Sequence, residues 1–259
     1  MNTAELFCQF TEKNLDSSDA ATQYLKKRLW TPETAKLWRL GYFNEDKLIE
    51  LKLFLKDNKC DPQNLEDDVY IFKNNKSFLY NRLIFPIFDP FGSAVATAGR
   101  CFDDSKPKYF NTKFEKSEHL FGLNLSKHAI RKQNCVYVFE GYADVITCFQ
   151  NGIENVVCCM GVVFSEEHLS LLSHYCENII LVFDADAGGE KGRNLFNKKK
   201  LDTDNQYLWK DDSIKVKRVI LDKHKDADEY IKNQGAVALK EYFEACVSDE
   251  KLQKSLRGV

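Results

Sequence analysis

The sequence predicts an α/β protein in which a parallel sheet flanked by helices follows a mixed α+β subdomain rich in basic residues. Three observations predict this fold class. From residue 135 onward, short apolar runs alternate with helix-length connections, a pattern typical of a parallel sheet. Two of these runs end directly in acidic residues. Ahead of residue 134, short helical segments give way to strand-like segments that carry many lysines and arginines.

Short helices are predicted in the amino-terminal part of the chain, residues 1–68. Segments 20–29, 34–40 and 47–56 have helical character, and Thr31-Pro32 is typical of a helix start because proline suits the first helical position. By physics alone this part is a packing module.

Strand signals begin at residue 69. Strands are predicted over residues 69–72, 77–79, 83–88 and 93–98, because these short runs are rich in strand-forming residues and are separated by turn residues. Basic and aromatic residues interleave here and in the segment that follows. Phosphates attract the cations and bases can stack on the rings, so the region predicts nucleic-acid binding. A solvated surface of mixed charge, with the aromatic rings in the core, is the alternative interpretation.

The parallel sheet is predicted from three apolar runs, residues 135–139, 156–160 and 179–183. They contain β-branched and aromatic residues and have the length of buried strands. Between the second and third runs, Ser165 is the predicted N-cap of a helix with Leu169 among its apolar positions.

Carboxylates follow two of these strands at once. Glu140 comes directly after the first run, and Asp184 and Asp186 follow the third. Parallel sheets place functional groups in the crevice beyond the carboxyl ends of their strands. Carboxylates held close together would have to protonate unless a hard divalent cation such as Mg²⁺ neutralises them. The pattern therefore favours a site for Mg²⁺ or Mn²⁺, with solvated loop acids as the alternative.

The acidic residues also carry a resemblance. Glu140-Gly141, Asp144 and Asp184-x-Asp186-x-x-Gly189 resemble the TOPRIM domain of primases, topoisomerases and some nucleases, and the Glu-Gly-Tyr-x-Asp-Val form is closest to DnaG-type primases. The resemblance implies a TOPRIM-type sheet, with Glu140, Asp184 and Asp186 as the catalytic residues. The resemblance adds a later acidic pair, Asp226 and Asp228, which follows a strand predicted over residues 216–221. The implied metal ligands are Glu140, Asp144, Asp184, Asp186, Asp226 and Asp228.

The basic region resembles the same family. Asn81-Arg82-Leu83-Ile84-Phe85-Pro86-Ile87, Ala98-Gly99-Arg100 and Pro107-Lys108-Tyr109-Phe110-Asn111 are similar to the motifs that precede the TOPRIM domain in DnaG-type primases. The resemblance implies that a set of residues here binds template and nucleotide. These residues are Arg82, Arg100, Lys108, Tyr109, Asn111 and Lys116.

Composition limits the remaining possibilities. The 259 residues include 37 basic and 39 acidic side chains, for a net charge of −2, so no overall positive field attracts nucleic acid. Nine cysteines, an odd number without a Cys-x-x-Cys pair, predict buried free thiols in a reducing cytoplasm and no zinc site. No apolar stretch is long enough to span a membrane.

The expected division of the chain is an amino-terminal subdomain over residues 1–133 (helical 1–68, β-rich 69–133), a TOPRIM domain over 134–232 and a short helical tail over 233–259. The resemblance implies a DNA primase core that makes short RNA primers on a single-stranded DNA template from ribonucleoside triphosphates. Zinc-binding and helicase-binding domains are expected to be missing from this chain, as in a phage or mobile-element protein. A replicative helicase and a zinc-binding module supplied in trans are the implied partners.

Two alternatives remain open at this stage. A TOPRIM nuclease would use the same acids to activate water against a phosphodiester bond. A non-catalytic primase relic would bind nucleic acid without reacting. The basic β region favours the primase over the nuclease, because TOPRIM nucleases do not need the Arg82 and Lys108 segments.

Overall fold

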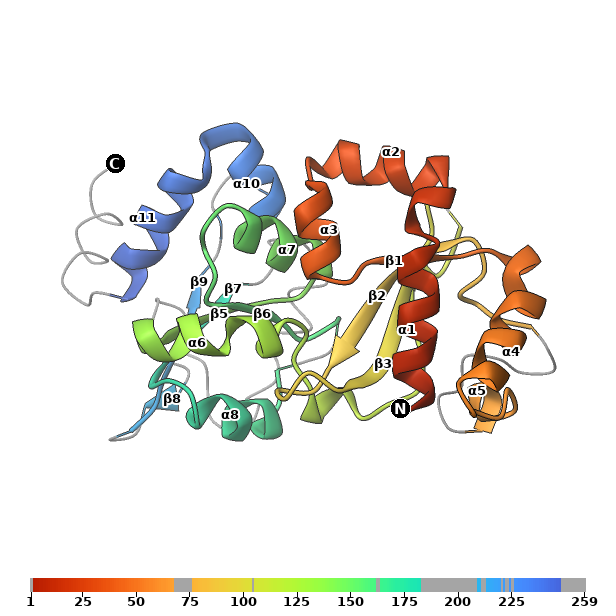
Figure 1. Ribbon diagram of the computed structural model, residues 1–259. Coiled ribbons are helices and arrows are strands. Elements are labelled where there is room, and N and C mark those ends of the chain that lie inside the picture. Colours follow the sequence, from red (N-terminus) through yellow and green to blue (C-terminus); the bar gives the residue numbers. More distant parts are fainter. Residues whose placement is uncertain are drawn as a thin grey trace. The chain divides into compact units, whose positions relative to one another are not determined.

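The computed structural model describes residues 2–67, 76–103, 105–161, 164–182, 209–210, 213–219, 221, 224 and 226–247. The chain divides into two compact units, Met1–Glu115 and Lys116–Val259 (Figure 1). The division precedes the boundary expected at residue 133. The reason is that Phe121 forms an antiparallel bridge with Cys158, and the helix after it packs against two strands of the second unit's sheet.

Short helices open the first unit, as the sequence predicts. They are α1 (Thr3–Lys13), the 3₁₀ helix η1 (Leu15–Ser17), α2 (Asp19–Arg28), α3 (Pro32–Leu37), η2 (Glu45–Lys47), α4 (Leu48–Asp57) and α5 (Asn64–Asp67). The predicted start at Thr31-Pro32 is confirmed: the Thr31 side chain accepts a hydrogen bond from the Thr34 backbone N–H at 3.2 Å. Such a cap satisfies one of the unpaired donors at a helix start.

The sheet of the first unit is antiparallel, in the order β1-β2-β3-β4. Its strands are β1 (Gly41–Phe43), β2 (Arg82–Phe88), β3 (Ala94–Arg100) and β4 (Tyr109–Asn111). Strand β1 lies inside the part predicted to be helical, so that prediction is wrong there. Local pattern missed it because β1 is short and forms by pairing with the distant β2. Gly41 permits the close approach of α1, since a Cβ at this position would lie 2.6 Å from Thr11 Oγ1.

Two other strand predictions have different outcomes. The prediction of a strand over residues 77–79 is wrong, because the backbone turns there and the Leu79 N–H donates to Ser77 Oγ at 3.1 Å. The turn leads into Asn81, whose φ of 56° is left-handed. The strand predicted over residues 69–72 lies outside the described residues.

The core of the first unit lies between α1, α4 and the sheet. Phe7 packs edge-on against Phe43 at a centroid distance of 5.2 Å, and Leu51 and Leu55 of α4 are fully buried in the same cluster. Burial of each such side chain contributes roughly 1.5–3 kcal/mol to folding. This apolar contact fixes the helices against the strands that carry the basic residues.

The second unit contains the predicted parallel sheet. Its strand order is β6-β5-β7-β9-β8. The strands are β5 (Cys135–Phe139), β6 (Val156–Cys158), β7 (Asn178–Val182), β8 (Trp209–Lys210) and β9 (Lys215–Val219). Strands β6, β5, β7 and β9 are parallel to one another, and β8 pairs antiparallel with β9. Antiparallel β8 was not predicted.

Helices cover both faces of this sheet. They are η3 (Lys116–Glu118), α6 (Leu123–Gln133), α7 (Tyr142–Gln150), α8 (Glu166–Ser173), α10 (Ala227–Gln234) and α11 (Ala236–Val247). Val136 and Val138 of β5 point into one apolar cluster, whereas Tyr137 stacks on Phe243 of α11 at 4.3 Å. Burial on both faces is why β5, β6 and β7 are apolar almost throughout rather than alternating.

The cysteines are free thiols, as predicted, and all except Cys60 are buried. Burial raises the pKa of Cys135 and of Cys176 to about 12. A thiol with so high a pKa is a poor nucleophile. Within the described part of the chain, no helix has the length and apolar character needed to cross a membrane.

Candidate active site

Glu140 lies where β5 ends, and its backbone is fixed to the end of the neighbouring strand. Its carbonyl oxygen accepts hydrogen bonds from the Gly161 N–H and from the Cys158 thiol, both at 3.0 Å. The residue is half-buried. Because parallel strands bring their carboxyl ends to one edge, Glu140 lies at the edge where the sequence predicts the site.

Asp144 lies in the first turn of α7, directly after Glu140 and Gly141. It is 8% exposed, and its Oδ2 lies so close to Gly141 that a Cβ there would be 2.8 Å away. Glycine at position 141 therefore gives the carboxylate room to fold back over the helix start. The amino-terminal end of a helix carries a partial positive charge, which stabilises a nearby carboxylate.

The later acidic residues are brought to Asp144 by α10. The Asp228 backbone N–H donates to Asp144 Oδ1 at 3.3 Å. Asp228 Oδ1 accepts from the Thr147 hydroxyl at 3.0 Å, and Lys232 Nζ lies 2.8 Å from Asp228 Oδ2. Asp226 is the N-cap of α10, where its Oδ1 accepts from the Glu229 N–H at 2.8 Å.

Two buried thiols, Cys148 and Cys158, lie within reach of the charges of these acids. Burial raises the pKa of Cys148 well above its usual range, and the charges of Asp144, Asp228 and Asp226 raise it further. For the Cys158 pKa, burial is again the main cause, and the charges of Asp144 and Glu140 contribute in the same direction. In these surroundings both thiols stay protonated.

The remaining predicted ligands, Asp184 and Asp186, lie outside the described residues. Val182 is the last described residue of β7 and pairs with Phe139, the residue that precedes Glu140. Across the described ranges, no group of three or more His, Cys, Asp or Glu side chains is close enough to hold a metal ion. Carboxylate oxygens are nevertheless the donors that Mg²⁺ prefers, so the residue types fit this ion.

Lys116 places a cation at the same edge of the sheet. It belongs to η3, is half-buried, and its Nζ lies 3.5 Å from the carbonyl oxygen of Met160, just beyond β6. Burial lowers the pKa of Lys116.

The predicted nucleic-acid residues of the first unit divide between the two faces of its sheet. Arg100 pairs with Tyr109, and Asn111 pairs with Ala98 in the same register, so Arg100, Tyr109 and Asn111 share one face. The Arg100 guanidinium lies over the Tyr24 ring at 4.2 Å and over the Tyr109 ring at 5.8 Å. Arg82 lies on the opposite face, together with its partner Phe43. The next residue, Leu83, pairs with Arg100 and shares its face, and neighbouring residues of a strand point to opposite faces.

Arg82 is buried, with 7% of its surface exposed. Its Nη1 donates to the carbonyl oxygens of Pro107 at 2.9 Å, and of Gly99 and Lys108 at 3.3 Å. The guanidinium therefore holds the loop from which the exposed Lys108 side chain projects. This burial distinguishes Arg82 from Lys108, although the sequence predicts the same role for both.

Two bonding partners of Asp228 were not anticipated, Thr147 and Lys232. Lys232 could have been found, because it follows Asp228 by four residues on one helix, a spacing at which oppositely charged side chains form ion pairs. Thr147 could not, because its contact with Asp228 joins two helices that are distant in sequence.

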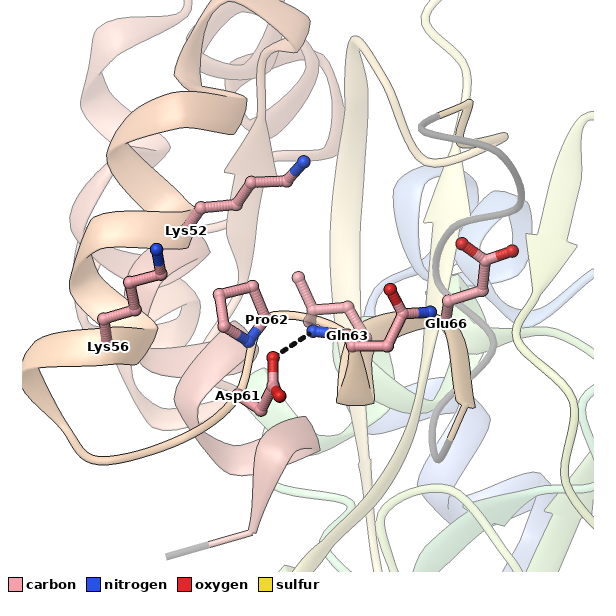
Figure 2. A pocket seen from close by; sticks show the side chains of 7 residues that line it. Lys52, Lys56, Asp61, Pro62, Gln63 and Glu66 are labelled. Atoms are coloured by element: carbon pink, nitrogen blue, oxygen red, sulfur yellow. Dashed lines mark hydrogen bonds between the residues drawn. The ribbon is translucent and has the colours of Figure 1, made fainter.

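A pocket of about 280 Å³ lies elsewhere, between α4 and the segment that enters α5 (Figure 2). Lys52 and Lys56 project from α4, and the Gln63 N–H donates to Asp61 Oδ1 at 3.0 Å on the other side. None of the predicted site residues lines this pocket. It therefore does not replace the acidic edge as the candidate site.

Comparison with known proteins agrees with the geometry. Residues 10–127 match the family described as DNA primase catalytic core, N-terminal domain, and residues 137–231 match the family described as Toprim-like. The DNA primase of Clostridium acetobutylicum is 30% identical to this chain over 95% of its length. The chain belongs to the DnaG-type primase catalytic cores. It spans 41% of the length of that relative, so the match covers the catalytic core with its TOPRIM domain.

Solved primase structures share the fold. A structure of the zinc-binding and RNA polymerase domains of the Aquifex aeolicus primase has a TM-score of 0.78 and 27% identity, and covers 93% of this chain and 59% of that one. A DnaG primase catalytic domain bound to single-stranded DNA has a TM-score of 0.73 and 24% identity, with coverage of 93% and 79%. TOPRIM domains generally use Mg²⁺.

Proposed function

We propose that this primase core synthesises RNA primers on single-stranded DNA. The 3′-hydroxyl of the growing primer attacks the α-phosphate of a ribonucleoside triphosphate, and pyrophosphate leaves. The observation that carries the proposal is the position of Glu140 at the carboxyl end of β5, beside Gly161. Asp144 in the first turn of α7 accepts a hydrogen bond from the Asp228 N–H of α10, and the Lys116 ammonium group lies 3.5 Å from Met160 O, just beyond β6. This arrangement joins ligands for a cation to a group that attracts phosphate.

A primer synthesis assay tests the proposal. The protein is incubated with single-stranded DNA, ribonucleoside triphosphates and Mg²⁺, and the products are separated by length. Short RNA products support the primase. Cleavage of the DNA without RNA products would instead indicate a TOPRIM nuclease, and neither product would indicate a non-catalytic relic.

The acidic residues would hold Mg²⁺ or Mn²⁺ in this reaction. We assign Glu140, Asp184, Asp186 and Asp226 as the ligands, and Asp144 and Asp228 as further ligands or as groups that orient the others. When bound, such ions neutralise the triphosphate and activate the attacking hydroxyl group. Thr147 and Lys232 hold the Asp228 carboxylate in one orientation, and Gly141 leaves room for that of Asp144.

The basic and aromatic residues would position the substrates. We assign Lys108, Lys116 and Arg100 to phosphates of template and triphosphate, and Tyr109 and Asn111 to the nucleic acid. Arg82 would act by holding the Lys108 loop, because its guanidinium is already bound to backbone carbonyl groups. Exposure of the Lys108 side chain supports a direct phosphate contact.

The proposed setting follows from the family. Curated relatives are longer than this chain, and the Aquifex aeolicus structure includes a zinc-binding domain. We propose that a zinc-binding module and a replicative helicase act with this core in the cytoplasm, and that the core comes from a phage or mobile element. Addition of either partner in the primer assay, with an increase in primer yield, tests this arrangement.

Mg²⁺ or Mn²⁺ at millimolar concentration is expected to raise the melting temperature of the wild-type protein. An ion that binds only the folded state stabilises it by mass action. Calorimetry with and without the ion measures the shift, and the Asp186→Ala variant is the control, in which the shift should shrink. Equal melting temperatures in all four samples would argue against a functional metal site.

Lys108→Ala is expected to weaken binding of single-stranded DNA and to reduce the salt slope of the affinity by about one unit, because one phosphate contact is lost. The melting temperature should barely change, since an exposed lysine contributes little to folding. Binding titrations at several salt concentrations measure the slope. Lys113→Ala is the matched control, because Lys113 is an exposed lysine in the same unit. The same slope in the wild type and Lys108→Ala would remove Lys108 from the interface.

A further inference from the structure

His168 is a buried side chain at the start of α8 that joins two segments of the second unit. It is fully buried. Its Nδ1 accepts a hydrogen bond from the Ser165 N–H at 3.2 Å. Its Nε2 lies 2.8 Å from the carbonyl oxygen of Lys116 and 3.1 Å from that of His119. One ring thus binds the beginning of α8 and both ends of the η3 segment.

These contacts fix the protonation state of the ring. Nδ1 faces an N–H donor and must accept, whereas Nε2 faces two carbonyl oxygens and must donate. The ring is therefore neutral, with its proton on Nε2. Burial lowers the pKa of His168 from its usual value of 6.5, which favours the same neutral form at pH 7.

The position of Lys116 depends on the contacts of its backbone, because its carbonyl oxygen accepts from the His168 ring and from the His119 N–H at 3.2 Å. None of the residues of η3, Lys116–Glu118, is buried. The Lys116 carbonyl group is bound by the His168 ring, and the side chain then runs towards Met160 O at the carboxyl edge of the sheet. A hydrogen bond at the backbone of Lys116 therefore determines where its ammonium group can reach.

We propose that His168 is a positioning residue for Lys116: by binding the Lys116 carbonyl oxygen, the imidazole places the ammonium group where it contacts the phosphates of the incoming ribonucleoside triphosphate. The inference rests on the proposed function, in which Lys116 binds phosphate. His168 itself touches no substrate in this proposal. Its effect should therefore appear in nucleotide affinity and pass through Lys116.

A control variant must separate positioning from stability alone. Asn155 is 1% exposed, and its Nδ2 donates to the Cys135 carbonyl oxygen at 3.0 Å. Cys135 begins β5, at the amino edge of the sheet and away from Glu140. Asn155→Leu therefore removes a buried side-chain hydrogen bond in the same unit without touching η3 or the acidic edge.

The first experiment compares His168→Leu, His168→Gln and Asn155→Leu. Titration with a fluorescent ribonucleoside triphosphate gives Kd, and primer synthesis gives KM and kcat. We expect His168→Leu to raise Kd and KM about tenfold, the loss that follows when one charged hydrogen bond to phosphate is weakened, with a smaller change in kcat. His168→Gln keeps an N–H donor of similar reach and should restore most of the affinity. Asn155→Leu should lower the melting temperature and leave Kd unchanged.

The second experiment is a double-mutant cycle. If His168 acts through Lys116, the Lys116→Ala/His168→Leu variant binds nucleotide no more weakly than Lys116→Ala alone. Additive losses would overturn the inference, as would an unchanged Kd in His168→Leu or equal effects of His168→Leu and Asn155→Leu. Failure of the proposed function is distinct: the wild type would then make no primers, whereas the binding titrations would still report whether His168 controls the nucleotide contact of Lys116.

Discussion

Replacing Asp186 by alanine should abolish primer synthesis while leaving the protein folded, and Asp184→Ala should have the same effect. Both residues follow β7, the strand that pairs with β5 on one side and β9 on the other. In the proposed mechanism their carboxylates hold the metal that neutralises the triphosphate, and no other group in the reaction can replace that charge. A cluster of like charges also repels itself, so the melting temperature measured without metal should stay the same or rise slightly.

Primer yield and a melting curve, measured on the same preparation, decide this prediction. Asp226→Ala is an informative companion, because Asp226 also caps α10 and the loss of its side-chain oxygen should lower stability as well as activity. Primer synthesis at the wild-type level in either Asp184→Ala or Asp186→Ala would refute the assignment of these residues as metal ligands.

Glu140→Gln should reduce the rate of primer synthesis by at least about a hundredfold, if the carboxylate acts as a base or as a key ligand. Glutamine has nearly the same size, and the backbone carbonyl group at this position keeps its bonds from Gly161 and Cys158. The substitution therefore removes a charge and a basic oxygen with little change in packing. We expect a loss in kcat rather than a loss of folding.

Glu177→Gln is the matched control for this charge removal. Glu177 immediately precedes β7, at the amino edge of the same sheet, where its carboxylate accepts from Asn134 Nδ2 at 3.1 Å. It should retain nearly full activity. If both glutamine variants lost activity to the same degree, the effect would come from a general change in charge. The assignment of Glu140 as a base or metal ligand would then be wrong.

Several elements of the fold were predictable because their signals are local. Strands β5, β6 and β7 are continuous apolar runs of strand length, and a parallel sheet buries both of its faces, so the pattern is unambiguous. The helix starts at Thr31 and Ser165 depend on a side chain that binds a backbone group within the same turn. Strand β1 was missed for a different reason, because it exists by pairing with β2, which is far away in sequence.

The same distinction holds for the site. The positions of Glu140 and of the Asp184/Asp186 pair after strands could be predicted, because strand ends and acidic residues are both visible along one chain, and parallel strands share an edge. The contact of Asp228 with Thr147, the burial of the Arg82 guanidinium against the Lys108 loop and the bond from His168 to Lys116 became known from the fold alone. Each of these depends on which distant segments pack together, since burial and hydrogen-bond partners are set by packing across the fold and leave no periodic signal in the sequence.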